Sequence, residues 1–190
     1  NGKLYLDETV RRMVTTHRSA LSDLAYQLFV EGYNAARPMT DSITGRTAEP
    51  DLSYAADRYA KAVTILNLIE EKLPAKAAPY SVQEGYQIAD TYLRIAAETG
   101  DKKLKEKGMK ILHDDLMRYG KYIPYFMELR RSLPGSGFSG LTTADRYVPT
   151  YIYMLLQTYS QEGGDLTALG EELKQVGVDI ADLEYFLPKE

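Results

Sequence analysis

Apolar residues along this chain recur at steps of three and four, the spacing that predicts amphipathic α-helices. The clearest stripe runs from Leu6 to Leu28, and it predicts one helix that begins after the N-cap residue Asp7 and ends by Gly32. No segment alternates apolar and polar residues for long enough to predict a β-strand. The chain is therefore expected to be all-α.

The remaining stripes raise the expected total to about seven to eight helices. Ser81 and Glu84 have the spacing of a capping box, and Pro124 suits the first turn of a helix. Two segments lack periodicity: a long surface loop at 34–50 and a Gly-rich connector at 133–141. The further expected helices cover about 52–73, 82–99, 102–119, 124–132, 144–161, 165–176 and 179–186.

Three of these helices share one spacing, in which a small or apolar pair precedes a leucine or tyrosine and then a glycine. The second helix adds Ala62, Leu66 and Pro74 at the spacing of a tetratricopeptide repeat. We therefore expect residues 1–190 to form a single tetratricopeptide-like domain of stacked helical hairpins, with a plain helical bundle as the alternative. The three spacings are Leu24-Ala25 with Leu28 and Gly32, Ile88-Ala89 with Tyr92 and Gly100, and Leu155-Leu156 with Tyr159 and Gly163.

Composition narrows the classes of function. The net charge of −4 argues against a nucleic-acid partner, which normally meets a basic surface. The longest mostly apolar run, 148–156, is far shorter than the roughly 20 residues of a membrane span. The absence of cysteine excludes a disulfide framework. The 16 tyrosines suit either a core edged with Tyr or a surface that contacts a peptide or sugar.

Candidate catalytic chemistry is sparse. The two histidines, His17 and His113, lie in no zinc-binding spacing, and His17 falls on the apolar stripe of the first helix, which predicts a core or interface position. Adjacent carboxylates such as Asp114 and Asp115 diverge by about 100° around a helix. We expect no catalytic, cofactor or metal site, and a small hydrolase that uses one histidine is the rival from another class.

A binding groove follows from the register of the hairpins. If Leu24, Ile88 and Leu155 face partner helices, residues two positions away turn toward a concave surface. Aromatic, carboxylate, amide and guanidinium groups together suit a peptide or a sugar chain, although ordinary half-exposed helix positions explain them as well. The candidate groove residues are Ser22, Tyr26, Tyr86, Asp90, Arg94, Tyr153 and Gln157.

The amino end of the chain carries a resemblance to a known family, in the segments Leu4 to Met13, Thr16-His17-Arg18, Leu24-Ala25 and Glu31-Gly32. Through them the first 33 residues resemble the region that follows the membrane-embedded part of a Bacteroidetes family of multi-pass proteins. That family is similar to protein O-mannosyltransferases and carries a soluble tetratricopeptide-like tail. The likeness continues weakly through 69–74 and the repeat around Tyr92, but the loop 34–50 and the chain beyond about 120 match no part of it.

The resemblance implies a piece of a longer membrane protein on the periplasmic side of the inner membrane. The catalytic carboxylates of such an enzyme belong to the membrane part, so it transfers no catalytic role to Asp7 or Glu8. The expected function is a non-catalytic scaffold that binds a protein or glycan chain for a glycosyltransferase-like parent. A free-standing cytoplasmic adaptor for protein–protein contacts is the alternative.

Overall fold

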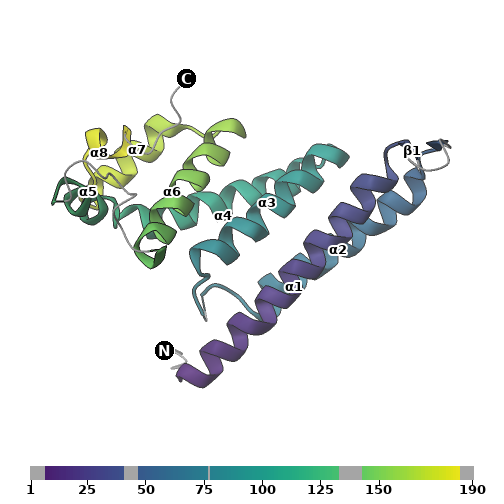
Figure 1. Cartoon of the computed structure of the whole chain (residues 1–190), viewed down its shortest axis with the longest axis horizontal. Helices are drawn as coiled ribbons and strands as arrows, with labels where there is room; N and C mark the ends of the chain where they lie inside the picture. Colours follow the sequence, from purple (N-terminus) through teal and green to yellow (C-terminus); the bar gives the residue numbers. More distant parts are fainter. Residues whose placement is uncertain (1–6, 41–46, 77, 133–142, 185–190) are drawn as a thin grey trace. The chain divides into compact units, whose positions relative to one another are not determined.

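The computed structural model describes residues 7–40, 47–76, 78–132 and 143–184, and within these ranges it confirms the all-α expectation. Eight helices pack in antiparallel pairs (Figure 1). The helices are α1 (Glu8–Ala35), α2 (Leu52–Lys72), α3 (Val82–Thr99), α4 (Lys102–Gly120), α5 (Ile123–Ser132), α6 (Thr143–Gln161), α7 (Leu166–Gln175) and α8 (Ile180–Glu184).

Helix bounds fall close to the expected ones because local caps fix them. The Asp7 carboxylate accepts the backbone N–H of Val10 at 2.8 Å, and Ser81 and Glu84 form both bonds of the predicted capping box. Gly100 ends α3 with φ of 71°, a left-handed conformation that glycine adopts without a steric penalty. Local chemistry therefore determines where most of the helices begin and end.

The predicted loop at 34–50 begins later than expected and holds a short β-ladder. Helix α1 continues through Gly32 to Ala35, because Gly32 lies inside the helix against the ring of Tyr59 rather than at a C-cap. Strands β1 (Met39–Thr40) and β2 (Thr47–Ala48) then pair antiparallel, Met39 opposite Ala48. Residues 41–46, and the whole connector expected at 133–141, lie outside the described residues.

Contacts divide the chain into two compact units, residues 1–105 and 106–190, and the boundary falls inside α4. The first unit is built on the antiparallel pair of α1 and α2, with α3 packed mainly against α1. The second unit has a core of its own. Its fully buried aliphatic side chains are Leu112, Leu116, Ile123, Ile152, Leu155 and Leu156.

The buried face of α1 is shifted by one residue from the predicted stripe. Arg18 is fully buried, whereas His17 is exposed and Leu24 keeps 48% of its surface in solvent. The guanidinium of Arg18 donates to the carbonyl oxygens of Leu73 and Ala78, both at 2.8 Å. Because Leu73 is the residue that ends α2, the first turns of α1 extend beyond the contact with α2, and their apolar residues have no core to enter. His17 was predicted to lie in the core or at an interface, and the prediction of a core position is wrong.

Candidate functional site

Polar and aromatic side chains gather where α1 and α3 lie side by side in the first unit. Gln87 on α3 donates through Nε2 to Oδ1 of Asp23 on α1 at 2.8 Å, so the two helices are linked at their surface. Arg94 and Asp90, one turn apart on α3, form an ion pair. This pair lies close to Tyr26 on α1 and Tyr86 on α3. We call Asp23, Tyr26, Tyr86, Gln87, Asp90 and Arg94 the α1–α3 face.

The charge at the centre of this face belongs to Arg94. The hydrogen bond that Arg94 donates to the Asp90 carboxylate raises the pKa of the guanidinium, and the neighbouring Tyr26 and Tyr86 act in the same direction. Arg94 stays half exposed while the carboxylate of Asp90 is mostly covered. The face thus combines the guanidinium of Arg94 with two half-buried tyrosines that interact with it electrostatically.

Four of the seven predicted groove residues meet here: Tyr26, Tyr86, Asp90 and Arg94. Ser22 does not contribute, because its side chain is fully buried and its hydroxyl donates to the carbonyl of Ser19 at 3.2 Å. Leu24 was expected to face the partner helix, and that expectation is wrong, although Ile88 and Leu155 are buried as predicted. Tyr153 and Gln157 lie on α6 in the second unit, where Tyr153 is 40% exposed.

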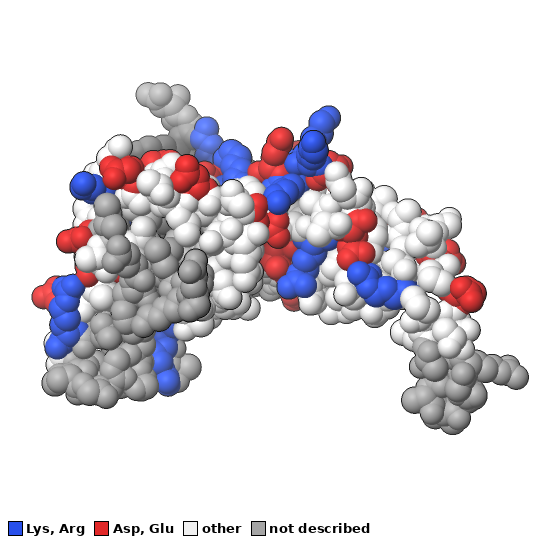
Figure 2. Space-filling view, turned by 90° about the horizontal axis from the view of Figure 1, so that it is seen from above, with Lys and Arg blue, Asp and Glu red and all other residues white. Residues whose placement is uncertain are grey.

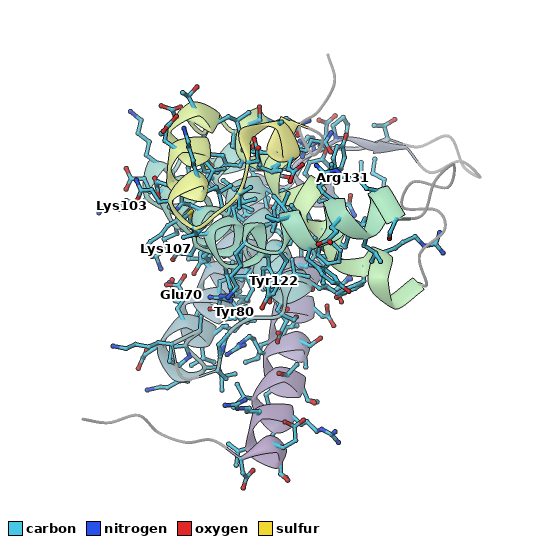
Figure 3. The ribbon with its side chains drawn as sticks, turned by 90° about the vertical axis from the view of Figure 1, so that its left-hand side faces the viewer. Glu70, Tyr80, Lys103, Lys107, Tyr122 and Arg131 are labelled. Carbon is cyan, nitrogen blue, oxygen red and sulfur yellow. The ribbon has the colours of Figure 1, made fainter. Side chains whose placement is uncertain are left out.

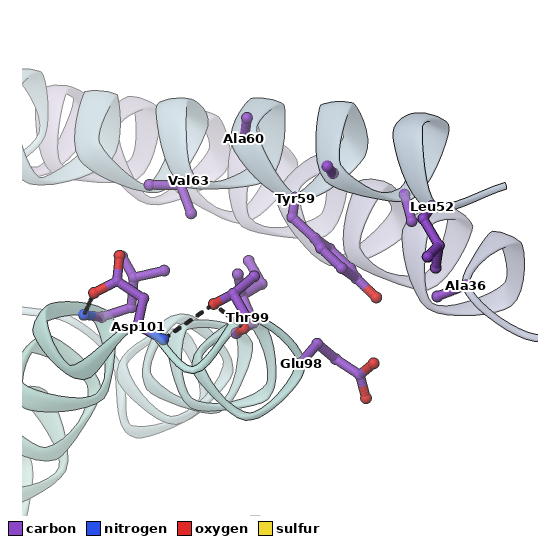
Figure 4. A pocket seen from close by; sticks show the side chains of 12 residues that line it. Ala36, Leu52, Tyr59, Ala60, Val63, Glu98, Thr99 and Asp101 are labelled. Carbon is purple, nitrogen blue, oxygen red and sulfur yellow. Dashed lines mark hydrogen bonds between the residues drawn. The ribbon is translucent and has the colours of Figure 1, made fainter.

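The first unit also holds an open pocket of about 540 Å³ that sequence reasoning did not find. It lies between α2 and the junction of α3 with α4 (Figure 4). Three of the six residues that α2 contributes are alanines, which have small side chains. The pocket is lined by Ala36, Leu52, Ala55, Ala56, Tyr59, Ala60, Val63, Ile95, Glu98, Thr99, Asp101 and Leu104.

Tyr59 is the buried polar residue of this pocket. Its ring stacks on Phe29 with centroids 6.0 Å apart and lies so close to Gly32 that a Cβ there would stand 2.7 Å from Cε1. Only 7% of the residue is exposed, and burial raises the pKa of the phenol, followed by the nearby charge of Glu98. The hydroxyl nevertheless makes no hydrogen bond of ordinary geometry with the described residues.

An ion pair stands at the rim of the pocket beside Tyr59. Arg37 donates through both terminal nitrogens to the two carboxylate oxygens of Glu98, at 2.8 and 3.2 Å. The same guanidinium lies 3.4 Å from the centre of the Tyr33 ring. The Glu98 hydrogen bond raises the pKa of Arg37, although the guanidinium is exposed to solvent. This geometry fixes the position of the Glu98 carboxylate at the mouth.

The other buried polar groups of the first unit serve structure. Glu84 caps α3 and lies 3.8 Å from Arg18, so both charges are compensated inside the protein. The fully buried Tyr92 donates to Oδ1 of Asn67 at 3.1 Å. Its neighbours Glu70 and Tyr80 are labelled in Figure 3. These contacts connect α2, its connector to α3, and α3 itself.

Neither histidine stands in a recognisable catalytic arrangement. His113 on α4 places Nε2 3.1 Å from the Glu172 carboxylate on α7, and its ring lies 6.3 Å from that of Tyr159. Among the described residues, no group of three or more histidine and acidic side chains could hold a metal ion. Within the same ranges, no helix is both long and apolar enough to cross a lipid bilayer.

The charges on the visible surface are mixed. Figure 2 shows Lys and Arg side chains next to Asp and Glu side chains on the face in view, without a broad region of one sign. Positive and negative groups in such proximity largely cancel each other's field at a distance.

Comparison with models of protein families, with curated protein sequences and with solved structures finds no match for this chain.

Proposed function

We propose that this chain is a non-catalytic binding domain that presents its α1–α3 face to a protein or glycan chain. The observation that carries the proposal is the Arg94–Asp90 ion pair, with which two half-buried tyrosines, Tyr26 and Tyr86, interact electrostatically. Tyrosine rings supply contact area at a small entropic cost, while a fixed guanidinium and carboxylate give directional hydrogen bonds. Sugars and extended peptides both offer the hydroxyl or amide groups that such a surface recognises.

We further infer that the hairpins stack as in tetratricopeptide domains, which present the first helix of each hairpin to the ligand. The packing of α3 mainly against α1, the first helix of the preceding hairpin, supports this arrangement. The close crossing of α1 and α2 at Gly32, where the backbone meets Tyr59 and Ala55, supports it too. A superhelix would place the α1–α3 face on its concave side.

The resemblance of the first 33 residues adds a location to the proposal. The domain would be the extracytoplasmic tail of a glycosyltransferase-like membrane protein and would hold an acceptor protein, a glycan or a neighbouring subunit. The alternative is a free-standing cytoplasmic adaptor. Reading the coding sequence upstream of residue 1 separates the two, because several apolar spans there support the membrane protein and their absence overturns it.

The binding face is tested with two ligand collections. The chain and its Arg94→Glu variant are screened against a glycan array and a phage library of random peptides. Because the substitution places a second carboxylate beside Asp90, we expect the ligands of the wild-type chain to be lost. Arg12→Glu, at an exposed guanidinium paired with Glu8 on α1, is the matched control and should keep them. Ligands that survive Arg94→Glu, or no ligand in either collection, would overturn the proposal.

A further inference from the structure

The pocket beside Tyr59 shares no residue with the α1–α3 face, and its size fits a small organic ligand or a single side chain. Small-molecule sites usually measure about 300 to 1,000 Å³ and combine apolar walls with a few polar groups. The apolar lining includes Ala56, Ala60 and Val63 of α2 and Leu104 of α4. Among the polar lining residues, Glu98 lies on the side of the Tyr59 hydroxyl, whereas Asp101 lies toward Val63 (Figure 4). An elongated apolar chain with one polar head matches this division.

The Tyr59 hydroxyl gives the first indication of what the head must be. Figure 4 shows the ring extending from α2 with its hydroxyl directed toward the region between Glu98 and Ala36. Only 7% of the surface of Tyr59 is exposed, and its hydroxyl forms no hydrogen bond of ordinary geometry with the described residues. Glu98 and Arg37 interact with this hydroxyl without such a bond. A ligand group that hydrogen-bonds to it with good geometry therefore gains affinity.

The neighbouring polar groups are nearly all hydrogen-bond acceptors. Glu98 contributes a carboxylate, and so does Asp101, which caps α4 by accepting the N–H of Lys103 at 2.8 Å. Thr99 donates its proton to the carbonyl of Ile95 at 2.7 Å, which leaves only lone pairs on its oxygen. Among the described residues, no Lys, Arg or His lines the pocket. Arg37 at the rim donates one hydrogen bond to each carboxylate oxygen of Glu98, and each of these oxygens can accept another.

We propose that this pocket binds a primary alkylammonium group, with the aliphatic chain along the alanines of α2 and the ammonium at Tyr59 and Glu98. The ammonium has three N–H donors and no acceptor, which complements a site rich in acceptors. Its charge suits the carboxylate of Glu98, whose side chain is only 22% exposed. A free alkylamine and the lysine side chain of a partner protein share this chemistry.

The test is a titration of the isotopically labelled full chain, followed by amide chemical shifts at pH 7. The probes are n-hexylamine, n-hexanol and hexanoate, which share a chain and differ in the head. We expect saturable shifts centred on Ala60, Glu98 and Gly100, with hexylammonium bound about tenfold more tightly than hexanol, the factor for one charge-assisted hydrogen bond. Equal binding of the alcohol, stronger binding of the carboxylate, or no saturable shift would overturn the proposal.

Two variants and one control locate the binding. Ala60→Phe fills the pocket from an exposed position of α2 and should abolish binding, whereas Ala20→Phe, exposed on α1, should leave it unchanged. Tyr59→Phe keeps the ring and should weaken hexylammonium more than hexanol. Binding that survives Ala60→Phe in a folded protein would contradict the site.

A further probe, Nα-acetyl-lysine methylamide, separates the two sources of the ammonium group. If it binds at the same amides, the ligand is a lysine side chain, and if it does not bind, the ligand is a free amine.

Discussion

The guanidinium of Arg18 lies 4.4 Å from the centre of the Tyr80 ring, and the arginine side chain is completely buried. The same group donates hydrogen bonds to the carbonyl oxygens of Leu73 and Ala78. One residue of α1 therefore fixes both the end of α2 and its connector to α3. A buried cation is stable only when such partners compensate for its lost hydration. Arg18 is therefore the structural centre of the first unit.

Replacing Arg18 by methionine should lower the free energy of unfolding by about 3 kcal/mol, because two carbonyls and the buried Glu84 lose their partner. Urea denaturation measures the loss. Adding Glu84→Gln should recover part of it, since the orphaned carboxylate is then neutral and the capping box is kept. Arg11→Met, at an exposed position of α1, is the control and should change stability by less than about 0.5 kcal/mol. Equal effects of the two arginine variants would contradict this role.

Replacing Gly32 by alanine should destabilise the protein although alanine favours helices. The new Cβ would stand 2.7 Å from Cε1 of Tyr59 and 3.1 Å from the carbonyl oxygen of Ala55. The Tyr59 ring is held by Phe29, so overpacking should outweigh the propensity gain and leave a net loss of about 2 kcal/mol. Thermal or urea unfolding measures this change in the free energy of unfolding.

A matched glycine tests the physical reason. At Gly120 a Cβ would meet Cδ2 of Leu173, also at 2.7 Å, but that methyl group ends a flexible side chain that can rotate away. Gly120→Ala should therefore cost less than Gly32→Ala. A larger loss at Gly120, or a stabilising Gly32→Ala, would show that ring contact does not control the crossing of α1 and α2.

The sequence predicts the helices well because the signals that bound them are local. Asp7, Ser81 and Gly100 are within a few residues of the backbone groups they satisfy, and the apolar period indicates the extent of each helix. The same period brings Tyr86, Asp90 and Arg94 to one side of α3. Register alone therefore places three of the seven candidate groove residues on one side of a helix, while the groove itself stays a prediction.

The sequence does not predict features that depend on where helices end relative to one another. The stripe through Met13 and His17 is apolar, yet α1 meets the end of α2 only at Arg18, so that stripe stays exposed. A buried arginine contradicts average residue preferences, and only its distant carbonyl partners explain it. The pocket likewise depends on the distance between α2 and the junction of α3 with α4. The only indication of it in the sequence is the group of small residues Ala55, Ala56 and Ala60 in α2.

Replacing Gly100 by alanine should lower the free energy of unfolding by about 1 kcal/mol. A Cβ at Gly100 would have no atom within 4 Å, so the loss comes only from forcing φ of 71° on an L-residue. Gly100→Asn should lose less, because asparagine tolerates the left-handed region. Urea denaturation of the three proteins gives the order wild type, asparagine, alanine. An alanine variant as stable as wild type would mean that the turn between α3 and α4 adopts another conformation.

Alkaline pH should destabilise the protein through Tyr92. Burial raises the pKa of this phenol, and the nearby Glu70 carboxylate raises it further. In the unfolded chain a tyrosine titrates near pH 10. Below that pH both states keep the proton, and the contribution of Tyr92 to stability is complete. As the pH rises above about 10, the unfolded chain loses the proton first, so the free energy of unfolding falls by at most about 1.4 kcal/mol per pH unit.

Tyr92→Phe isolates this contribution. At pH 8 the variant should be about 1 kcal/mol less stable, because the hydrogen bond to Asn67 is lost. Between pH 10 and 11.5 its stability should decline less steeply than that of the wild type, so the two curves converge. Burial also raises the pKa values of Tyr59 and Tyr159, so the stability of the variant should still decline somewhat over this pH range. Urea denaturation at each pH gives both curves, with Tyr125→Phe as the control for an exposed ring. Parallel curves for the wild type and Tyr92→Phe would show that ionisation of Tyr92 does not drive the alkaline transition.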